Sequence, residues 1–111
     1  MPNLSLVVIR TPDIEKTRQF YERLLGVSFA REQHGGGPVH YAVELQGKIV
    51  FEIYPGIKTD NVLGFRTHFI NGCINRASPF FSKPPRLTRA GDRITHAVLY
   101  DPDGRRVELT E

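Results

Sequence analysis

The sequence has little of several features that mark particular protein classes. It contains no tryptophan, one methionine and a single cysteine, Cys73. One cysteine excludes an internal disulfide, which favours a reducing compartment over a disulfide-stapled secreted scaffold. No apolar run is long enough to span a bilayer, and the run from Leu6 to Ile9 is far shorter than the apolar core of a signal peptide. We therefore expect a cytoplasmic protein with no membrane partner.

The charge pattern lacks long runs of one sign. The formal net charge is +3, but the basic residues are scattered along the 111 residues. The densest group, residues 83–93, is interrupted by Pro84 and Pro85 and has no interleaved aromatic side chains. Because nucleic-acid surfaces combine clustered cations with stacking aromatics, we expect no nucleic-acid partner. The length and the 40% hydrophobic content predict a single globular domain over residues 1–111.

The chain reads as two copies of one unit, offset by 56 residues. Without any gap, the offset aligns six identical pairs: Arg10 with Arg66, Thr11 with Thr67, Ile14 with Ile70, Gly35 with Gly91, His40 with His96, and Glu52 with Glu108. Apolar positions also correspond. A repeat of this length is a supersecondary unit, and two such units can bury each other's exposed faces. The predicted repeats cover about residues 1–56 and 57–111.

Each unit predicts a strand, a helix and then further strands. In the first unit, a β-branched strand ends at Thr11, which is predicted to be the N-cap of a helix that ends at Gly26. A strand near 27–33, a flexible glycine-rich turn or lid at 34–38 and a hairpin over 40–54 follow. In the second unit we expect a helix over about 71–82, mostly loop over 83–93, and a final hairpin that turns at 101–104.

The turn at 101–104 fixes the register of the final hairpin. Its sequence "DPDG" is typical of a type I turn followed by a left-handed glycine. This turn places Val98 opposite Glu108 and puts His96 on the same face. The matching register in the first hairpin puts His40 and Glu52 together, on the face away from the helix. A two-residue turn at 46–47 would instead flip His40 relative to Glu52, so both registers stay open for the first hairpin.

The opening and closing motifs resemble a known family. "TPD" leading into "FYERLLG", and the closing "DPDGRRVELTE", are similar to the vicinal oxygen chelate superfamily, which includes glyoxalase I, bleomycin-resistance proteins and extradiol dioxygenases. The resemblance covers nearly the whole chain. It implies an α+β fold of two tandem βαβββ units that form a half-barrel around a cavity, often completed in a homodimer.

The resemblance also bears on metal binding. Metal-dependent members hold a divalent ion with residues of the first and last strands of each unit, and the last-strand positions correspond to Glu52 and Glu108. The first-strand positions, where histidine is usual, fall on Leu6 and Val62. Two carboxylates alone are a poor site for zinc or nickel. The resemblance therefore implies a member with a degenerate metal site and no cofactor; a divalent metal held in a rearranged site with His40 and His96 is the alternative.

Seven residues are predicted to bind a ligand: Glu52, Glu108, Tyr54, Arg10, Arg66, His40 and His96. The arginines suit an anionic or oxygen-rich ligand, and the two glutamates are also the candidates for a catalytic role. Each residue has a plainer interpretation. The histidines can be surface residues at strand ends, and the glutamates can be satisfied by arginines and water.

The leading hypothesis is a metal-independent small-molecule-binding protein of the glyoxalase and bleomycin-resistance type. The second is a lyase, isomerase or dioxygenase with an unconventional metal site, and the third is a structural or regulatory dimer with a vestigial cavity.

Overall fold

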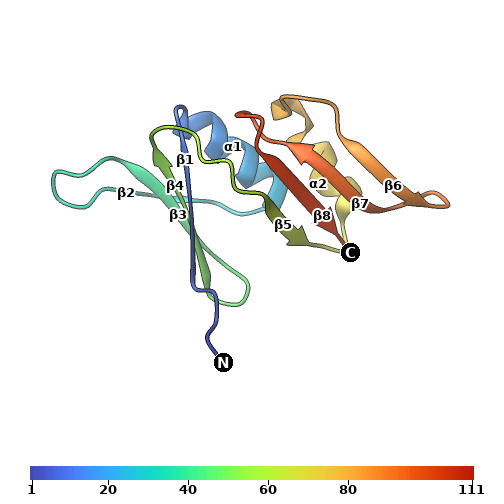
Figure 1. Ribbon diagram of the computed structural model, residues 1–111, viewed down its shortest axis with the longest axis horizontal. Coiled ribbons are helices and arrows are strands. Elements are labelled where there is room, and N and C mark those ends of the chain that lie inside the picture. Colours follow the sequence, from blue (N-terminus) through green and yellow to red (C-terminus); the bar gives the residue numbers. More distant parts are fainter.

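The computed structural model describes all 111 residues as two successive βαβββ units (Figure 1). The first unit consists of β1 (Leu6–Thr11), α1 (Ile14–Leu25), β2 (Ala30–Glu32), β3 (His40–Leu45) and β4 (Ile49–Pro55). The second consists of β5 (Leu63–Arg66), α2 (Ile70–Ala77), the 3₁₀ helix η1 (Ser78–Phe80), β6 (Arg86–Ala90), β7 (Arg93–Tyr100) and β8 (Arg106–Thr110). Neither α-helix is long and apolar enough to cross a membrane.

Each unit builds one four-stranded mixed sheet. The strand orders are β1-β4-β3-β2 and β5-β8-β7-β6, with β1 parallel to β4, β5 parallel to β8, and the remaining neighbours antiparallel. The two helices pack against each other, and the sheets extend to either side of them (Figure 1). The α+β fold class with two tandem βαβββ units is therefore confirmed.

The 56-residue offset holds in the strand registers as well as in the sequence. Val8 pairs with Glu52 in the first sheet as Gly64 pairs with Glu108 in the second. Likewise, Ala42 pairs with Glu52 as Val98 pairs with Glu108. The register predicted from the turn at 101–104 is thus confirmed for both hairpins. Gly104 has the expected left-handed backbone, with φ of 83°. In the first hairpin the loop is three residues long, 46–48, so the two-residue alternative is wrong.

The start of α1 differs from the sequence prediction, whereas its end does not. Asp13 rather than Thr11 is the N-cap, and its carboxylate accepts a hydrogen bond of 3.0 Å from the backbone N–H of Lys16. Thr11 remains in β1, where its buried hydroxyl lies 3.0 Å from that of Thr17. The hydroxyl of Thr11 therefore lies in the core, and Asp13 caps the helix in its place. Gly26 ends the helix with φ of 67°, as predicted.

Two predictions for the second unit are wrong. The helix α2 ends at Ala77, and Pro79 falls in the short η1 that follows, because proline has no N–H to continue an α-helical ladder. The segment expected to be loop contains β6, which pairs with β7. All five residues of β6 are exposed. The strand therefore has no buried face, and the alternation of apolar and polar residues that predicts a half-buried strand does not identify it.

Candidate functional site

The face of the first sheet that points away from α1 carries a column of stacked side chains. His40 of β3 stacks on the ring of Tyr54 in β4, with ring centroids 4.1 Å apart and planes 8° apart. The guanidinium of Arg10 in β1 lies 5.4 Å from the centroid of the Tyr54 ring. His40 is 1% exposed, so its interpretation as a surface residue at a strand end is wrong. The register of β1, β4 and β3 brings these three predicted residues together.

Both ring nitrogens of His40 face hydrogen-bond acceptors. Nδ1 lies 3.3 Å from the carbonyl oxygen of Pro38, and Nε2 lies 3.2 Å from a carboxylate oxygen of Glu32. A carboxylate oxygen of Glu52 is 3.6 Å from the same Nε2. His34, in the glycine-rich loop, places its Nε2 3.8 Å from Glu32. The ligand atoms of Glu32, His34 and His40 all lie within 4.8 Å of one another, so they form a possible metal-binding group.

Sequence reasoning missed Glu32 and His34 in this group. Glu32 pairs with His40 across β2 and β3. Glu32 could have been found from the sequence, because extending the predicted hairpin register by one further strand would have placed it beside His40. The position of His34 depends on the path of the loop, which no periodicity in the sequence specifies.

The second sheet holds the corresponding histidine–glutamate pair. Nε2 of His96 lies 3.0 Å from one carboxylate oxygen of Glu108, and Nε of Arg106 lies 3.0 Å from the other. The hydrogen bond from His96, followed by the positive charge of Arg106, lowers the pKa of Glu108 below its ordinary value of 4.5. Glu108 is therefore a carboxylate satisfied by neighbours on its own face of the sheet.

No hydrogen bond or ion pair joins the group around Glu52 to the group around Glu108. Each glutamate is held by the histidine of its own unit. The convergence of Glu52 and Glu108 on one shared cavity stays a prediction.

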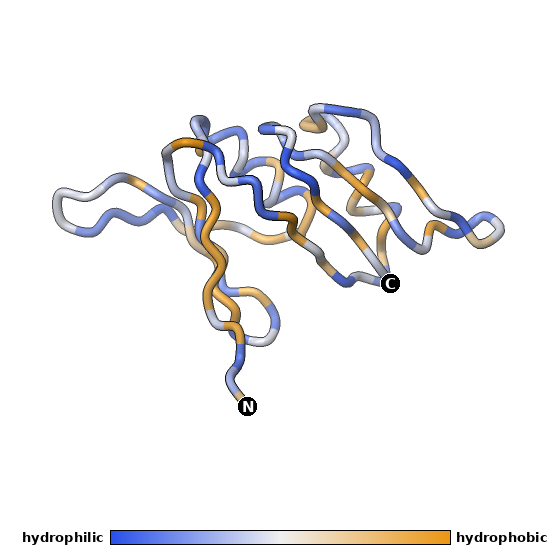
Figure 2. Tube along the Cα trace, viewed as in Figure 1, coloured by the Kyte–Doolittle hydropathy of each residue, from blue (hydrophilic) through white to orange (hydrophobic).

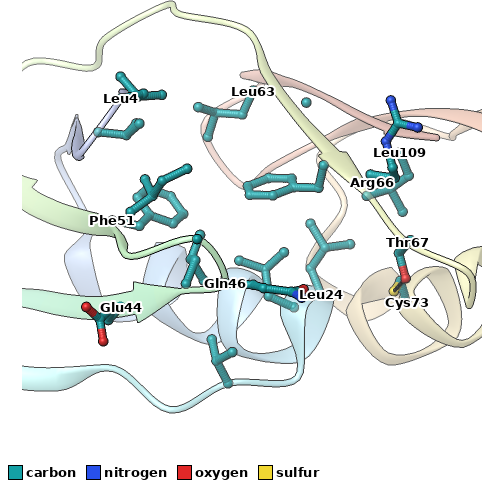
Figure 3. Close-up of a pocket in the computed structure, with 18 of the residues that line it drawn as sticks. Leu4, Leu24, Glu44, Gln46, Phe51, Leu63, Arg66, Thr67, Cys73 and Leu109 are labelled. Carbon is teal, nitrogen blue, oxygen red and sulfur yellow. Dashed lines mark hydrogen bonds between the residues drawn. The ribbon is translucent and has the colours of Figure 1, made fainter. Parts of the chain in front are cut away.

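A cleft of about 970 Å³ lies between the two units (Figure 3). It is lined by 22 residues, of which 14 are hydrophobic, so its walls are mostly apolar. Leu24 and Phe51 contribute from the first unit, and Leu63 and Leu109 from the second (Figure 3). In β4 and β8 the lining residues alternate with Glu52 and Glu108. The cleft is thus built mainly from the apolar, helix-facing sides of the sheets, and Glu44, Gly64 and Arg66 line it from the polar faces.

Polar groups lie at the two ends of the cleft. Arg66, at the end of β5, and Glu44, in β3, occupy opposite ends (Figure 3). The guanidinium of Arg66 makes no hydrogen bond or ion pair within the chain, whereas that of Arg76 is fixed by donating 2.8 and 3.3 Å hydrogen bonds to the carbonyls of Arg23 and Leu24. Of the seven predicted ligand-binding residues, only Arg66 lines this cleft.

Comparison with known proteins identifies one family. The sequence model described as "Glyoxalase/Bleomycin resistance protein/Dioxygenase superfamily" matches residues 3–72. No curated protein matches the chain at a significant level.

Several solved structures share the architecture. TnmS3, an antibiotic binding protein from Streptomyces sp. CB03234, is 18% identical with a TM-score of 0.72, over 99% of this chain and 95% of that chain. Oxidase ChaP-H2 is 15% identical with a TM-score of 0.70, over 97% and 91%. A mutant of the fosfomycin resistance protein FosX from Listeria monocytogenes, complexed with Mn(II) and a dihydroxypropylphosphonic acid, is 19% identical with a TM-score of 0.67, over 99% and 90%. At these identities the likeness establishes the fold alone.

Proposed function

Because the chain belongs to the glyoxalase/bleomycin resistance protein/dioxygenase superfamily, we propose that it binds a small molecule in the cleft between its two units. The cleft itself carries the proposal. Its volume of about 970 Å³ is at the upper end of the range for small-molecule sites, which are mostly apolar with a few placed polar groups. TnmS3, described as an antibiotic binding protein, supports a binding role for this architecture.

The ligand class follows from the polar groups of the cleft. Arg66 has no partner within the chain, and a planar guanidinium binds carboxylate, sulfonate or phosphonate groups with two parallel hydrogen bonds. Glu44 at the opposite end disfavours a second anionic group there. The ligand we propose therefore has an apolar, ring-sized body and one anionic group, which lies against Arg66.

We propose that this binding requires no metal. The cleft lining includes no histidine, and its cysteine, Cys73, is buried. The hydroxyl of Thr67 and the guanidinium of Arg76 lie 3.9 and 3.7 Å from its sulfur. Zinc, nickel and iron sites need several nitrogen, sulfur or carboxylate donors together, and the cleft offers no such set.

We also propose a homodimer. Strands β1 and β5 are edge strands of their sheets, and Leu6, an apolar side chain of β1 that does not line the cleft, is exposed. Figure 2 shows hydrophobic residues along most of β1. A second copy that covers the edge of β1 would bury this side chain. The six predicted ligand-binding residues outside the cleft would contact a ligand only if such a dimer brings the polar sheet faces together.

A metal-dependent enzyme is the second candidate. The group formed by Glu32, His34 and His40 favours it, as do two relatives by their descriptions, an oxidase and a Mn(II) complex. In that case a reaction would depend on added divalent metal and on these side chains. The binding function would depend on neither.

The binding proposal can be tested with 8-anilinonaphthalene-1-sulfonate, a dye that combines an apolar ring system with one sulfonate. The dye should bind the wild type with enhanced fluorescence. Arg66→Gln should weaken binding about fivefold, equivalent to about 1 kcal/mol, because glutamine keeps a hydrogen-bond donor but loses the charge and the second bond at an exposed site. Arg89→Gln is the matched control, because Arg89 is also an exposed strand arginine without an ion pair and does not line the cleft.

A second substitution tests the location by filling space. Gly64 lines the cleft, and a Cβ added there would meet no atom within 4 Å. Gly64→Phe should therefore preserve the fold and reduce dye binding. Gly36→Phe is the control, because Gly36 is equally open and lies outside the cleft. Dye binding unchanged in both Arg66→Gln and Gly64→Phe would exclude this cleft as the site.

A further inference from the structure

We propose that Glu32, His34 and His40, with Glu52 beside them, form a transition-metal site of the zinc class in the first unit. The site lies where β2 and β3 meet the glycine-rich loop, on the sheet face away from α1. The ligand atoms of the first three residues all lie within 4.8 Å of one another. None of the four residues lines the cleft between the units. The site therefore goes beyond the proposed binding function and is independent of it.

The hydrogen bonding of His40 supports a cation at Nε2. The Pro38 carbonyl can only accept, so Nδ1 carries the proton at the 3.3 Å contact. Nε2 then faces Glu32 at 3.2 Å and Glu52 at 3.6 Å, and carboxylates also only accept. A proton or a metal ion on Nε2 satisfies both carboxylates, and the presence of two carboxylates and a second imidazole around this one nitrogen favours the metal ion. Histidine ligands characteristically donate their other ring N–H to a backbone carbonyl, as Nδ1 does here.

The separations suit a four-coordinate ion. Bonds of about 2.0–2.1 Å in a tetrahedron place neighbouring ligand atoms about 3.3 Å apart. The His40–Glu32 contact is 3.2 Å, and the His34–Glu32 contact is 3.8 Å. Glu32 and His34 are partly exposed side chains, with 39% and 76% of their side-chain surfaces accessible, so small rotations close the remaining gaps. Two imidazoles with carboxylates favour zinc, nickel or iron over magnesium or calcium.

The repeat supplies an internal comparison. The pair of Glu32 with His40 corresponds to the pair of Thr88 with His96, in the same register of the second sheet. At the position equivalent to His34 the second unit has Ala90. Both units thus keep the histidine–glutamate pair that the sheet places side by side. Only the first adds two further donors, so the second unit lacks the ligand set.

A metal at this site would fasten the loop to the sheet. His34 lies in the loop, next to Gly35–Gly37, whereas Glu32 and His40 lie in strands. Coordination by both parts restricts the loop, and an ion that binds only the folded chain raises its stability.

Calorimetric titration of the metal-free, full-length protein with zinc chloride tests the proposal. We expect one zinc per chain, and no binding of magnesium chloride. His34→Ala and Glu32→Gln should each weaken zinc binding at least about tenfold, since even loss of a supporting contact costs about 10- to 100-fold. Both side chains are accessible, so the fold should survive. His96→Ala is the matched control and should bind zinc as the wild type does.

Nuclear magnetic resonance of the imidazole rings locates the ion directly. Zinc should shift the ring signals of His34 and His40 and leave those of His96 unchanged. Absence of zinc binding to the wild type, wild-type affinity in both His34→Ala and Glu32→Gln, or equal weakening in His96→Ala would each overturn the proposal. Dye binding to the cleft should be the same with and without zinc. Failure of the zinc proposal would therefore not affect the test of the cleft.

Discussion

The phenol of Tyr21 in α1 donates a 2.7 Å hydrogen bond to the carboxylate of Asp101, 80 residues later, in the turn between β7 and β8. Both residues are fully buried, as is Arg105, whose guanidinium forms an ion pair with the same carboxylate. Arg105 also donates 2.8 Å hydrogen bonds to the carbonyls of Thr59 and Arg10. One buried network therefore fastens the last turn of the second unit to the helix, first strand and linker of the first.

Removing the charge of Asp101 should be strongly destabilising. Asp101→Asn leaves the Arg105 guanidinium buried without its counter-ion, and breaking a buried pair in this way costs about 3–5 kcal/mol. Urea unfolding should show this loss. The control is Asp103→Asn, because Asp103 contacts Arg105 only at 3.4 Å and its loss leaves the ion pair of Arg105 with Asp101 in place, so it should cost clearly less. Equal losses in the two variants would contradict a central role for Asp101.

The same network predicts a loss of stability at alkaline pH. Burial, followed by the charge of Asp101, raises the pKa of Tyr21 well above its ordinary value of 10.0. The folded state therefore holds this proton more tightly than the unfolded state. The resulting stability is complete below pH 10 and is lost as the pH rises from there toward the folded-state pKa of Tyr21.

Tyr21→Phe should reduce this alkaline loss. The variant should retain part of it, because a hydrogen bond to Glu15 also raises the pKa of Tyr41. The free energy of unfolding at pH about 9 and about 11 measures the difference. A loss as steep in Tyr21→Phe as in the wild type would show that Tyr21 does not carry the effect.

The polar faces of the sheets could be predicted from the sequence because the register depends on local turns. The turn at 101–104 set His96 beside Glu108, and the repeat carried the same relation to His40 and Glu52. The burial of His40 could not be predicted in this way. It depends on stacking with Tyr54 and on the position of His34 in the loop, which are tertiary contacts.

The cleft, too, could not be predicted from the sequence patterns. Phe51 and Leu109 alternate with Glu52 and Glu108 along β4 and β8, and both belong to the core. Periodicity specifies which face of a strand is apolar, but not whether another element covers all of it. Between the two units part of that apolar face stays open, and the cleft forms there.

The final prediction concerns the proposed homodimer and the edge strand β1. Leu6 is 49% exposed at the start of this strand, and we expect a second copy to bury it. In a two-fold dimer a substitution occurs twice. Loss of about 1.5 kcal/mol of apolar burial at each copy amounts to about 3 kcal/mol, or about a hundredfold in the dimer dissociation constant. Leu6→Lys should therefore sediment as a monomer at tens of micromolar, where the wild type sediments as a dimer.

Ile57→Lys separates this effect from a general change in surface hydrophobicity. Ile57 is 92% exposed in the linker between β4 and β5, outside both edge strands. This variant should remain a dimer, and both lysine variants should keep the wild-type free energy of unfolding within about 0.5 kcal/mol once measured as monomers. A monomeric wild type would contradict the dimer itself. A dimeric Leu6→Lys variant would instead show that the dimer contact lies away from β1. At a contact through β1, the variant would lose the apolar burial of Leu6, and the two symmetry-related lysines would also repel each other.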